Sequence, residues 1–128
     1  AADCQALRGE ALLRANRLDR AAVHLAASLA VRRRIGEPLG VIELTELTAC
    51  WLAERGRVEA ALALLAGADS ARSTLGAARL PRCATWVARL ETMLVDALPD
   101  HGPATARRDG TVHPWPQLGG MAFDELGR

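Results

Sequence analysis

The sequence repeats itself at an offset of 40 residues, and this feature limits the possible folds more than any other. Residues 12–36 align with residues 52–76 without a gap. The identical pairs are Leu12 and Leu52, Arg17 and Arg57, Ala21 and Ala61, Leu25 and Leu65, Ala26 and Ala66, Arg32 and Arg72, and Gly36 and Gly76. A fixed period of about 20 to 50 residues is typical of repeat architectures. We therefore expect a fold built from stacked, similar units.

Each unit is predicted to contain two helices joined by a tight turn. Apolar residues recur at helical spacing on both sides of a break at residues 16–18. Gly36-Glu37-Pro38 ends one helix and begins the next, since glycine suits the end of a helix and proline its first turn. Gly56 and Gly76 end the two helices that follow. The predicted units cover about residues 2–36 and 37–76, with a partial unit at residues 77–98.

The composition favours helix in every unit. Ala fills 26 of the 128 positions and Leu fills 20, whereas Tyr is absent and Phe occurs once. Ala and Leu are strong helix formers, and the aromatic residues that strands prefer are scarce. A chain of this length suits one domain. We expect an all-α fold, with antiparallel helix-turn-helix repeats stacked as a short right-handed α-solenoid of about five helices.

Residues 99–128 differ in character from the repeats. A fifth helix is expected from about Pro81 to Leu98, and Pro and Gly are frequent after it. This composition predicts an irregular or disordered tail, with a short helical turn near residues 121–126. Trp115 lies between two prolines in this tail. Two interpretations are open: Trp115 docks into a groove of a partner, or the tail folds back over an exposed face of the last repeat.

Residue types and spacing argue against several kinds of chemistry. Cys4, Cys50 and Cys83 are widely spaced, and neither they nor the three His residues show the paired spacing of a zinc site. Potential nucleophiles have no His or acid at a recognisable motif spacing. Charged residues interrupt every long apolar stretch, so no membrane span is expected. The net charge of +1 argues against direct binding to nucleic-acid phosphates. We expect a cytoplasmic protein with no catalytic activity, cofactor or metal.

The repeat unit resembles the tetratricopeptide repeat. Small residues stand where paired helices would cross, at Gly9 and Ala21 in the first unit and at Ala49 and Ala61 in the second. The stretch 28–98 further resembles the C-terminal repeats of bacterial ATPase-containing transcriptional regulators of the LuxR and SARP types. The residues that match are Ile35, Gly36, Glu37, Gly40, Gly56, Ala60, Ala61, Leu64, Leu65, Gly67, Ala68, Ala71, Arg72, Leu75 and Gly76.

This resemblance implies that the chain is the interaction or effector-sensing arm of a longer regulator. A chain without Lys cannot contain the usual phosphate-binding loop of such regulators. Stacked repeats form a concave face that binds a protein or peptide. The residues expected on this face are Glu43, Thr45 and Glu46, with Arg8 and Arg14 from the neighbouring unit.

Two alternative functions remain open at the level of sequence. An array without a polar capping helix exposes apolar surface at its end, which favours self-association with a second copy. A small-molecule effector could instead bind between helices near Trp51 and Trp86, although both Trp residues lie in apolar stripes that predict packing in the core.

Overall fold

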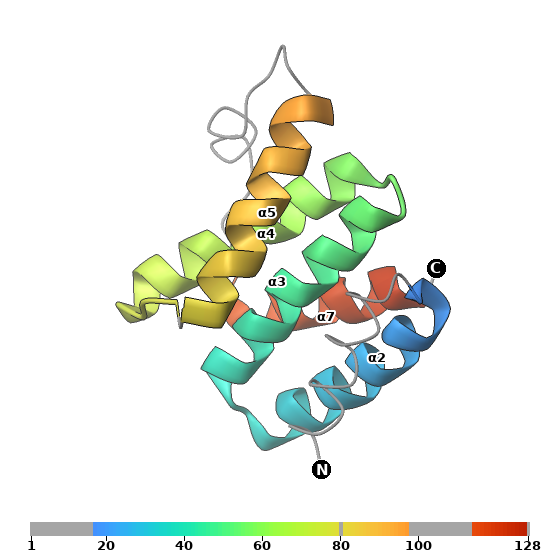
Figure 1. The fold of residues 1–128 in the computed structure, drawn as a ribbon. Helices are drawn as coiled ribbons and strands as arrows, with labels where there is room; N and C mark the ends of the chain where they lie inside the picture. Colours follow the sequence, from blue (N-terminus) through green and yellow to red (C-terminus); the bar gives the residue numbers. More distant parts are fainter. Residues whose placement is uncertain (1–16, 80, 98–113, 128) are drawn as a thin grey trace.

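The computed structural model describes residues 17–79, 81–97 and 114–127, and this part of the chain is entirely helical, with no strand (Figure 1). Its five helices are α2 (Leu18–Ile35), α3 (Pro38–Glu54), α4 (Val58–Leu75), α5 (Pro81–Ala97) and α7 (Trp115–Leu126). The expected all-α class is therefore confirmed.

The 40-residue repeat is visible in the helix boundaries. Helices α2 and α4 begin 40 residues apart, at Leu18 and Val58, and they end 40 residues apart, at Ile35 and Leu75. Each is followed by a glycine in the left-handed region, Gly36 with φ 77° and Gly76 with φ 66°. A side chain would strain the backbone there, so glycine is required at both positions. The helix ends predicted from these glycines are confirmed.

Helix α3 is the centre of the fold, because α2, α4, α5 and α7 all pack against it. It begins with Pro38 in its first turn, as the sequence predicts. Twelve of its 17 residues are buried, and they lie on all sides of the helix. A helix that is buried all round needs neighbours on every side. The small residues expected at a helix crossing, Ala49 on α3 and Ala61 on α4, are both fully buried.

Helix α7 corrects the prediction of an irregular tail over residues 115–126; residues 98–113 lie outside the described part of the chain. The physical reason is burial, since Leu118, Ala122 and Leu126 recur every four residues and are buried against the other helices. Gly119 and Gly120 lower the intrinsic helix propensity of this segment. Tertiary packing outweighs that cost, so the propensity of the segment alone gave the wrong answer.

The two helices after α4 pack on different neighbours. Helix α5 contacts α3 and α4, whereas α7 contacts α2, α3 and α4 and passes behind α3 in Figure 1. Within the described helices, α5 and α7 do not contact each other. A solenoid repeat contacts only its sequence neighbours. Because α7 reaches back across two units, the solenoid arrangement stays a prediction.

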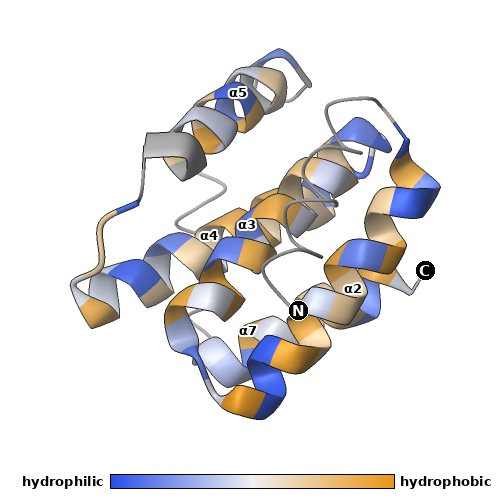
Figure 2. Ribbon diagram, turned by 60° about the horizontal axis from the view of Figure 1, so that its bottom comes forward, coloured by the Kyte–Doolittle hydropathy of each residue, from blue (hydrophilic) through white to orange (hydrophobic). Residues whose placement is uncertain are grey.

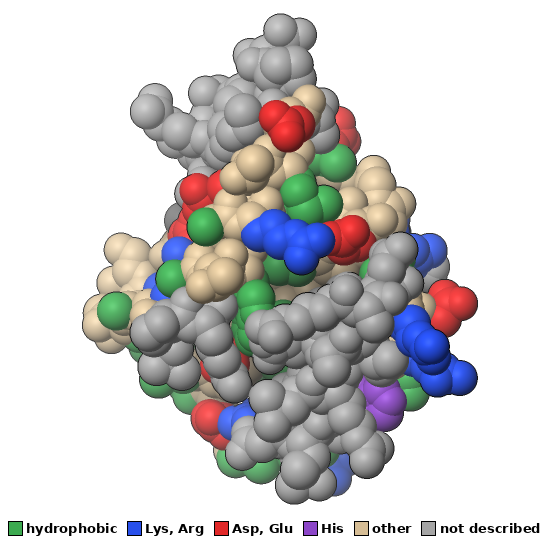
Figure 3. All heavy atoms as spheres, viewed as in Figure 1, with side chains coloured by type: hydrophobic (Ala, Val, Ile, Leu, Met, Phe, Trp, Pro, Cys, Tyr) green, Lys and Arg blue, Asp and Glu red, His purple; other side chains and the backbone are tan. Residues whose placement is uncertain are grey.

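The outer surface is mixed in character. Hydrophilic and hydrophobic residues both lie on the visible surface of α2 (Figure 2), where Val23 and Ile35 are exposed, and acidic and basic side chains lie close together on the face that carries α5 (Figure 3). One such pair joins Arg89 of α5 to Glu54 of α3, with 3.4 Å between nitrogen and oxygen. Among the described helices, none combines the length and the apolar character that a membrane crossing needs.

Candidate interaction site

The residues predicted for partner binding do not form one accessible face. Thr45 and Glu46 are both 0% exposed, and Glu43 is half-buried. The Thr45 hydroxyl donates a hydrogen bond of 2.8 Å to the carbonyl oxygen of Val41, within the same helix. The expected exposure of Thr45 and Glu46 is therefore wrong, because α3 is enclosed by four helices instead of lining a surface. Arg8 and Arg14 lie outside the described residues.

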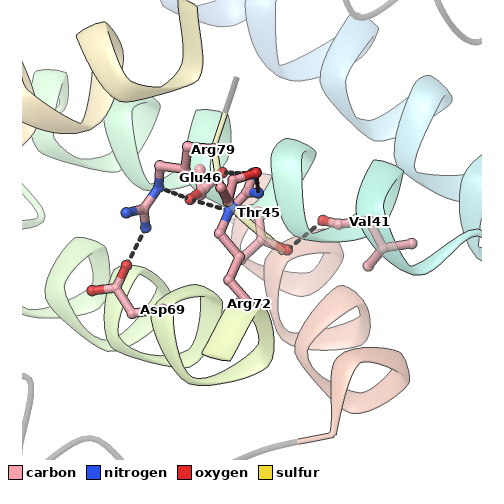
Figure 4. Close-up of polar contacts among 7 residues, drawn as sticks. Val41, Thr45, Glu46, Asp69, Arg72 and Arg79 are labelled. Atoms are coloured by element: carbon pink, nitrogen blue, oxygen red, sulfur yellow. Dashed lines mark hydrogen bonds and ion pairs between the residues drawn. The ribbon is translucent and has the colours of Figure 1, made fainter. Parts of the chain in front are cut away.

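Glu46 instead is the buried centre of an ionic cluster, which also contains Arg72 and the partly buried Asp69 and Arg79 (Figure 4). The Arg72 guanidinium binds both carboxylate oxygens of Glu46, with distances of 3.0 Å from Nε and 2.7 Å from Nη2. Two parallel bonds of this kind fix the relative position of the two side chains. Because Glu46 lies on α3 and Arg72 on α4, the pair joins these two helices.

Arg79 joins the segment after α4 to the same cluster. Its guanidinium donates to Glu46 on one side and to Asp69 on the other, as Figure 4 shows. Arg72 also donates to the carbonyl oxygen of Ala78 at 3.2 Å. Burial alone would lower the pKa of Arg79, but the bonds to Asp69 and Glu46 outweigh burial and raise that pKa above its ordinary value. Arg79 therefore stays charged and holds the chain between α4 and α5 against α3.

We assign this ionic cluster to structure and not to ligand binding. A surface hollow lies beside it, lined by residues 76–79 together with Asp69, Arg72 and Ser73. Two arginines at a hollow suggest an anion site, but both guanidinium groups already bind carboxylates, and the four side chains sum to zero charge. In the described part of the chain, no group of three or more His, Cys, Asp or Glu side chains is placed to hold a metal ion.

The Trp residues pack in and against the core. The indole N–H of Trp51 donates a hydrogen bond of 2.8 Å to the carbonyl oxygen of Leu18, and the Arg55 guanidinium lies 4.7 Å from the centre of its ring. Trp51 is buried, and Trp86 packs against the core from a half-buried position. The predicted core packing of both is confirmed. Trp115 is also half-buried against the core, and the segment 115–126 folds back onto α2, α3 and α4, of which α3 and α4 form the last complete repeat.

A groove formed by α2, α3 and α4 holds α7, and glycines set how closely the helices approach. At Gly67 of α4, an added Cβ atom would lie 2.6 Å from Cδ1 of Leu118. At Gly119 of α7, it would lie 2.8 Å from Cγ1 of Val41. Contacts this short do not occur between real side chains, so a side chain at either position would require the facing side chain or the helix to move. We call this surface the α7 groove.

The edges of the α7 groove are basic and meet acidic or aromatic side chains of α7. Arg57, directly before α4, binds Glu125 with 2.5 Å between nitrogen and oxygen. Arg33 of α2 lies 5.8 Å from the centre of the Phe123 ring, a distance suited to a cation–π interaction. The groove therefore combines an apolar floor with charged edges, which is the usual arrangement of a helix-binding surface.

Sequence reasoning missed this groove although one signal was present. Leu118, Ala122 and Leu126 follow a spacing of four, and only the last turn of this segment was predicted as helical. The role of Gly67 leaves no such signal, because nothing local to α4 indicates that a leucine from residue 118 lies against it.

Cys50 is expected to lower stability at alkaline pH. Its thiol donates to the carbonyl oxygen of Trp86 at 3.9 Å. Burial, followed by the charges of Glu46 and Glu54, raises the pKa of Cys50 to about 12. An unfolded thiol loses its proton near about pH 8.5, so the unfolded state binds fewer protons than the folded state from there up to pH 12. The free energy of unfolding should fall through this window, by about 1 to 2 kcal/mol at pH 10.

Urea unfolding at pH 7 and pH 10 measures this effect, with Cys50→Ala as the reference. The variant lacks the titrating thiol and should lose less stability between the two pH values. Equal losses for the original chain and the variant would contradict the assignment.

No family model matches this sequence in comparisons with known proteins, and no curated protein or solved structure matches it either.

Proposed function

We propose that this chain is a non-catalytic protein-interaction module that binds an amphipathic helix in the α7 groove. The observation that supports this most directly is α7 itself, a helix distant in sequence from α2, α3 and α4 that buries Leu118, Ala122 and Leu126 against them. A helix that buries one face in a groove between other helices is a recurring mode of protein recognition. The packing of α7 supports the proposal, because a partner helix would use the same contacts.

Within this proposal, the chain is the interaction or sensing arm of a larger bacterial transcriptional regulator. The support is the sequence resemblance to the repeats of LuxR and SARP-type regulators and the 40-residue period that α2 and α4 share. Self-association with a second copy and binding of a small-molecule effector stay as predicted alternatives.

The test supplies the α7 sequence as a separate peptide. In the full chain, Leu118→Glu places a charge against Gly67 and should release α7 from its groove. A fluorescein-labelled peptide of residues 114–127 should then bind this chain with a Kd on the order of 10–100 µM, measured by fluorescence anisotropy. The same peptide carrying Leu118→Glu is the matched control and should not bind.

A folded Leu118→Glu chain that fails to bind the unmodified peptide would refute the proposed function. Circular dichroism establishes whether this chain is folded. The measurement is repeated with the full chain carrying Ala122→Gln. This substitution places an uncharged polar side chain at a buried position of α7, so it should weaken the packing of α7 with less risk to the fold than a buried charge.

A further inference from the structure

Resting on the proposed function, we infer that α7 is a built-in competitor, and that the partner of the α7 groove is an acidic amphipathic helix of another protein, which binds by displacing α7. The inference depends on three features of the described residues: the shape of the groove floor, the charge of its edges, and the short length of α7.

The floor of the groove selects the apolar side of its occupant. Gly67 leaves room for a large side chain, which Leu118 fills, and Val41 leaves room only for a glycine at position 119. Ala122 and Leu126 continue the buried stripe at intervals of four residues. A partner helix that fits in the position of α7 presents a large apolar residue followed by a small one, and then further apolar residues four and eight positions after the first.

The edges of the groove select negative charge. Arg57 binds Glu125, and Arg33 lies against Phe123, next to Asp124 in the sequence. Asp124 and Glu125 are the only charged residues of α7, so the helix carries a net charge of −2, and two arginines lie against its side chains, Arg57 at Glu125 and Arg33 at Phe123. Charge complementarity of this kind favours an acidic partner and suppresses a basic one.

The short length of α7 makes it the described helix that is most easily exchanged for another. Helix α7 has 12 residues, whereas the other described helices have 17 or 18. Isolated helices of about 12 residues are marginal in water, so α7 depends on the groove for its helical state. A longer partner helix with the same apolar stripe would bury more apolar surface in the groove and take the place of α7.

The experiment compares two full chains that share the same groove. In Glu125→Arg, the new arginine faces Arg57 and weakens α7 in its own groove, while Leu118 and the floor are unchanged. The labelled peptide of residues 114–127 should bind this chain at least about tenfold more tightly than the original chain, in which α7 competes. The matched control is Gln117→Arg, which introduces an arginine at an exposed position of α7. The chain carrying this substitution should bind the peptide as weakly as the original chain.

A charge exchange tests the acidic character of the partner at the same site. In the Leu118→Glu chain, a further Arg57→Glu substitution should weaken binding of the unmodified peptide by about tenfold, and the peptide carrying Glu125→Arg should recover the lost affinity. Recovery by the reversed pair would show that the peptide occupies the groove in the orientation of α7.

The possible failures are distinct. If neither the Leu118→Glu nor the Glu125→Arg chain binds the peptide while both are folded, the proposed function itself is refuted. If the peptide binds the original and Glu125→Arg chains equally, binding in the groove stands, and competition by α7 is refuted. If competition is observed but the charge exchange has no effect, the acidic partner class is refuted.

Discussion

Replacing Arg72 by Met should lower the free energy of unfolding by about 3 to 5 kcal/mol. Arg72 binds both carboxylate oxygens of Glu46, and the Glu46 side chain has no exposed surface. Met fills a similar volume but removes the charge, so a buried carboxylate would lose its two-bond partner and keep only Arg79. Urea unfolding followed by circular dichroism measures the change.

Two further variants separate this buried pair from ordinary ion pairs. Arg89→Met removes the arginine of the pair with Glu54, in which the Arg89 side chain is 70% exposed, and it should cost less than about 1 kcal/mol. Adding Glu46→Gln to Arg72→Met removes the excess negative charge that two carboxylates and one guanidinium leave in the cluster, so the double variant should be more stable than Arg72→Met alone. A loss below about 1 kcal/mol for Arg72→Met would contradict the role assigned to the pair.

Replacing Trp51 by Ala should also cost about 3 to 5 kcal/mol. The side chain is among the largest of the fully enclosed ones, and its removal leaves a cavity where α3 meets the start of α2. The loss includes the hydrogen bond from the indole N–H to the carbonyl oxygen of Leu18 and the contact with Arg55. Thermal unfolding of the variant and of the original chain measures the difference.

Trp51→Phe divides that loss into its parts. Phe keeps an aromatic ring but lacks the N–H, so this variant should retain a large share of the packing and leave the Leu18 carbonyl without its donor. Equal stability of Trp51→Ala and Trp51→Phe would mean that packing of the aromatic ring contributes little to the free energy of unfolding. That result would contradict the role assigned to the buried Trp51 ring.

The boundaries of the repeats could be predicted from sequence because local residues determine them. Gly36 and Gly76 end their helices through backbone geometry that only glycine adopts without strain, and Pro38 begins α3 where its missing N–H has no cost. These effects act within a few residues of the chain. They appear in the sequence wherever they occur in the structure, and the 40-residue offset makes them easier to recognise.

The burial of Glu46 and the position of α7 could not be predicted in this way. A glutamate in a helix usually lies on the solvated side. Its burial depends on Arg72 and Arg79, which are 26 and 33 residues away and belong to other parts of the fold. The α7 segment contains two adjacent glycines, and its helical state depends on contacts with residues 41 and 67. Both features are set by tertiary packing. The spacing of Leu118, Ala122 and Leu126 indicates an amphipathic helix, but it does not indicate where that helix packs.

The central position of α3 has a consequence for how the chain unfolds. In arrays where each unit touches only its neighbours, one end can unravel while the other stays folded. Here the first and second units share contacts with a helix from the end of the chain, and α3 contacts every other described helix. Unravelling of α2 or α4 must disturb α3, so we expect these three helices to unfold together in one transition. Contacts between residues so far apart in sequence also slow folding, so we expect this chain to fold more slowly than a helical array in which only sequence neighbours touch.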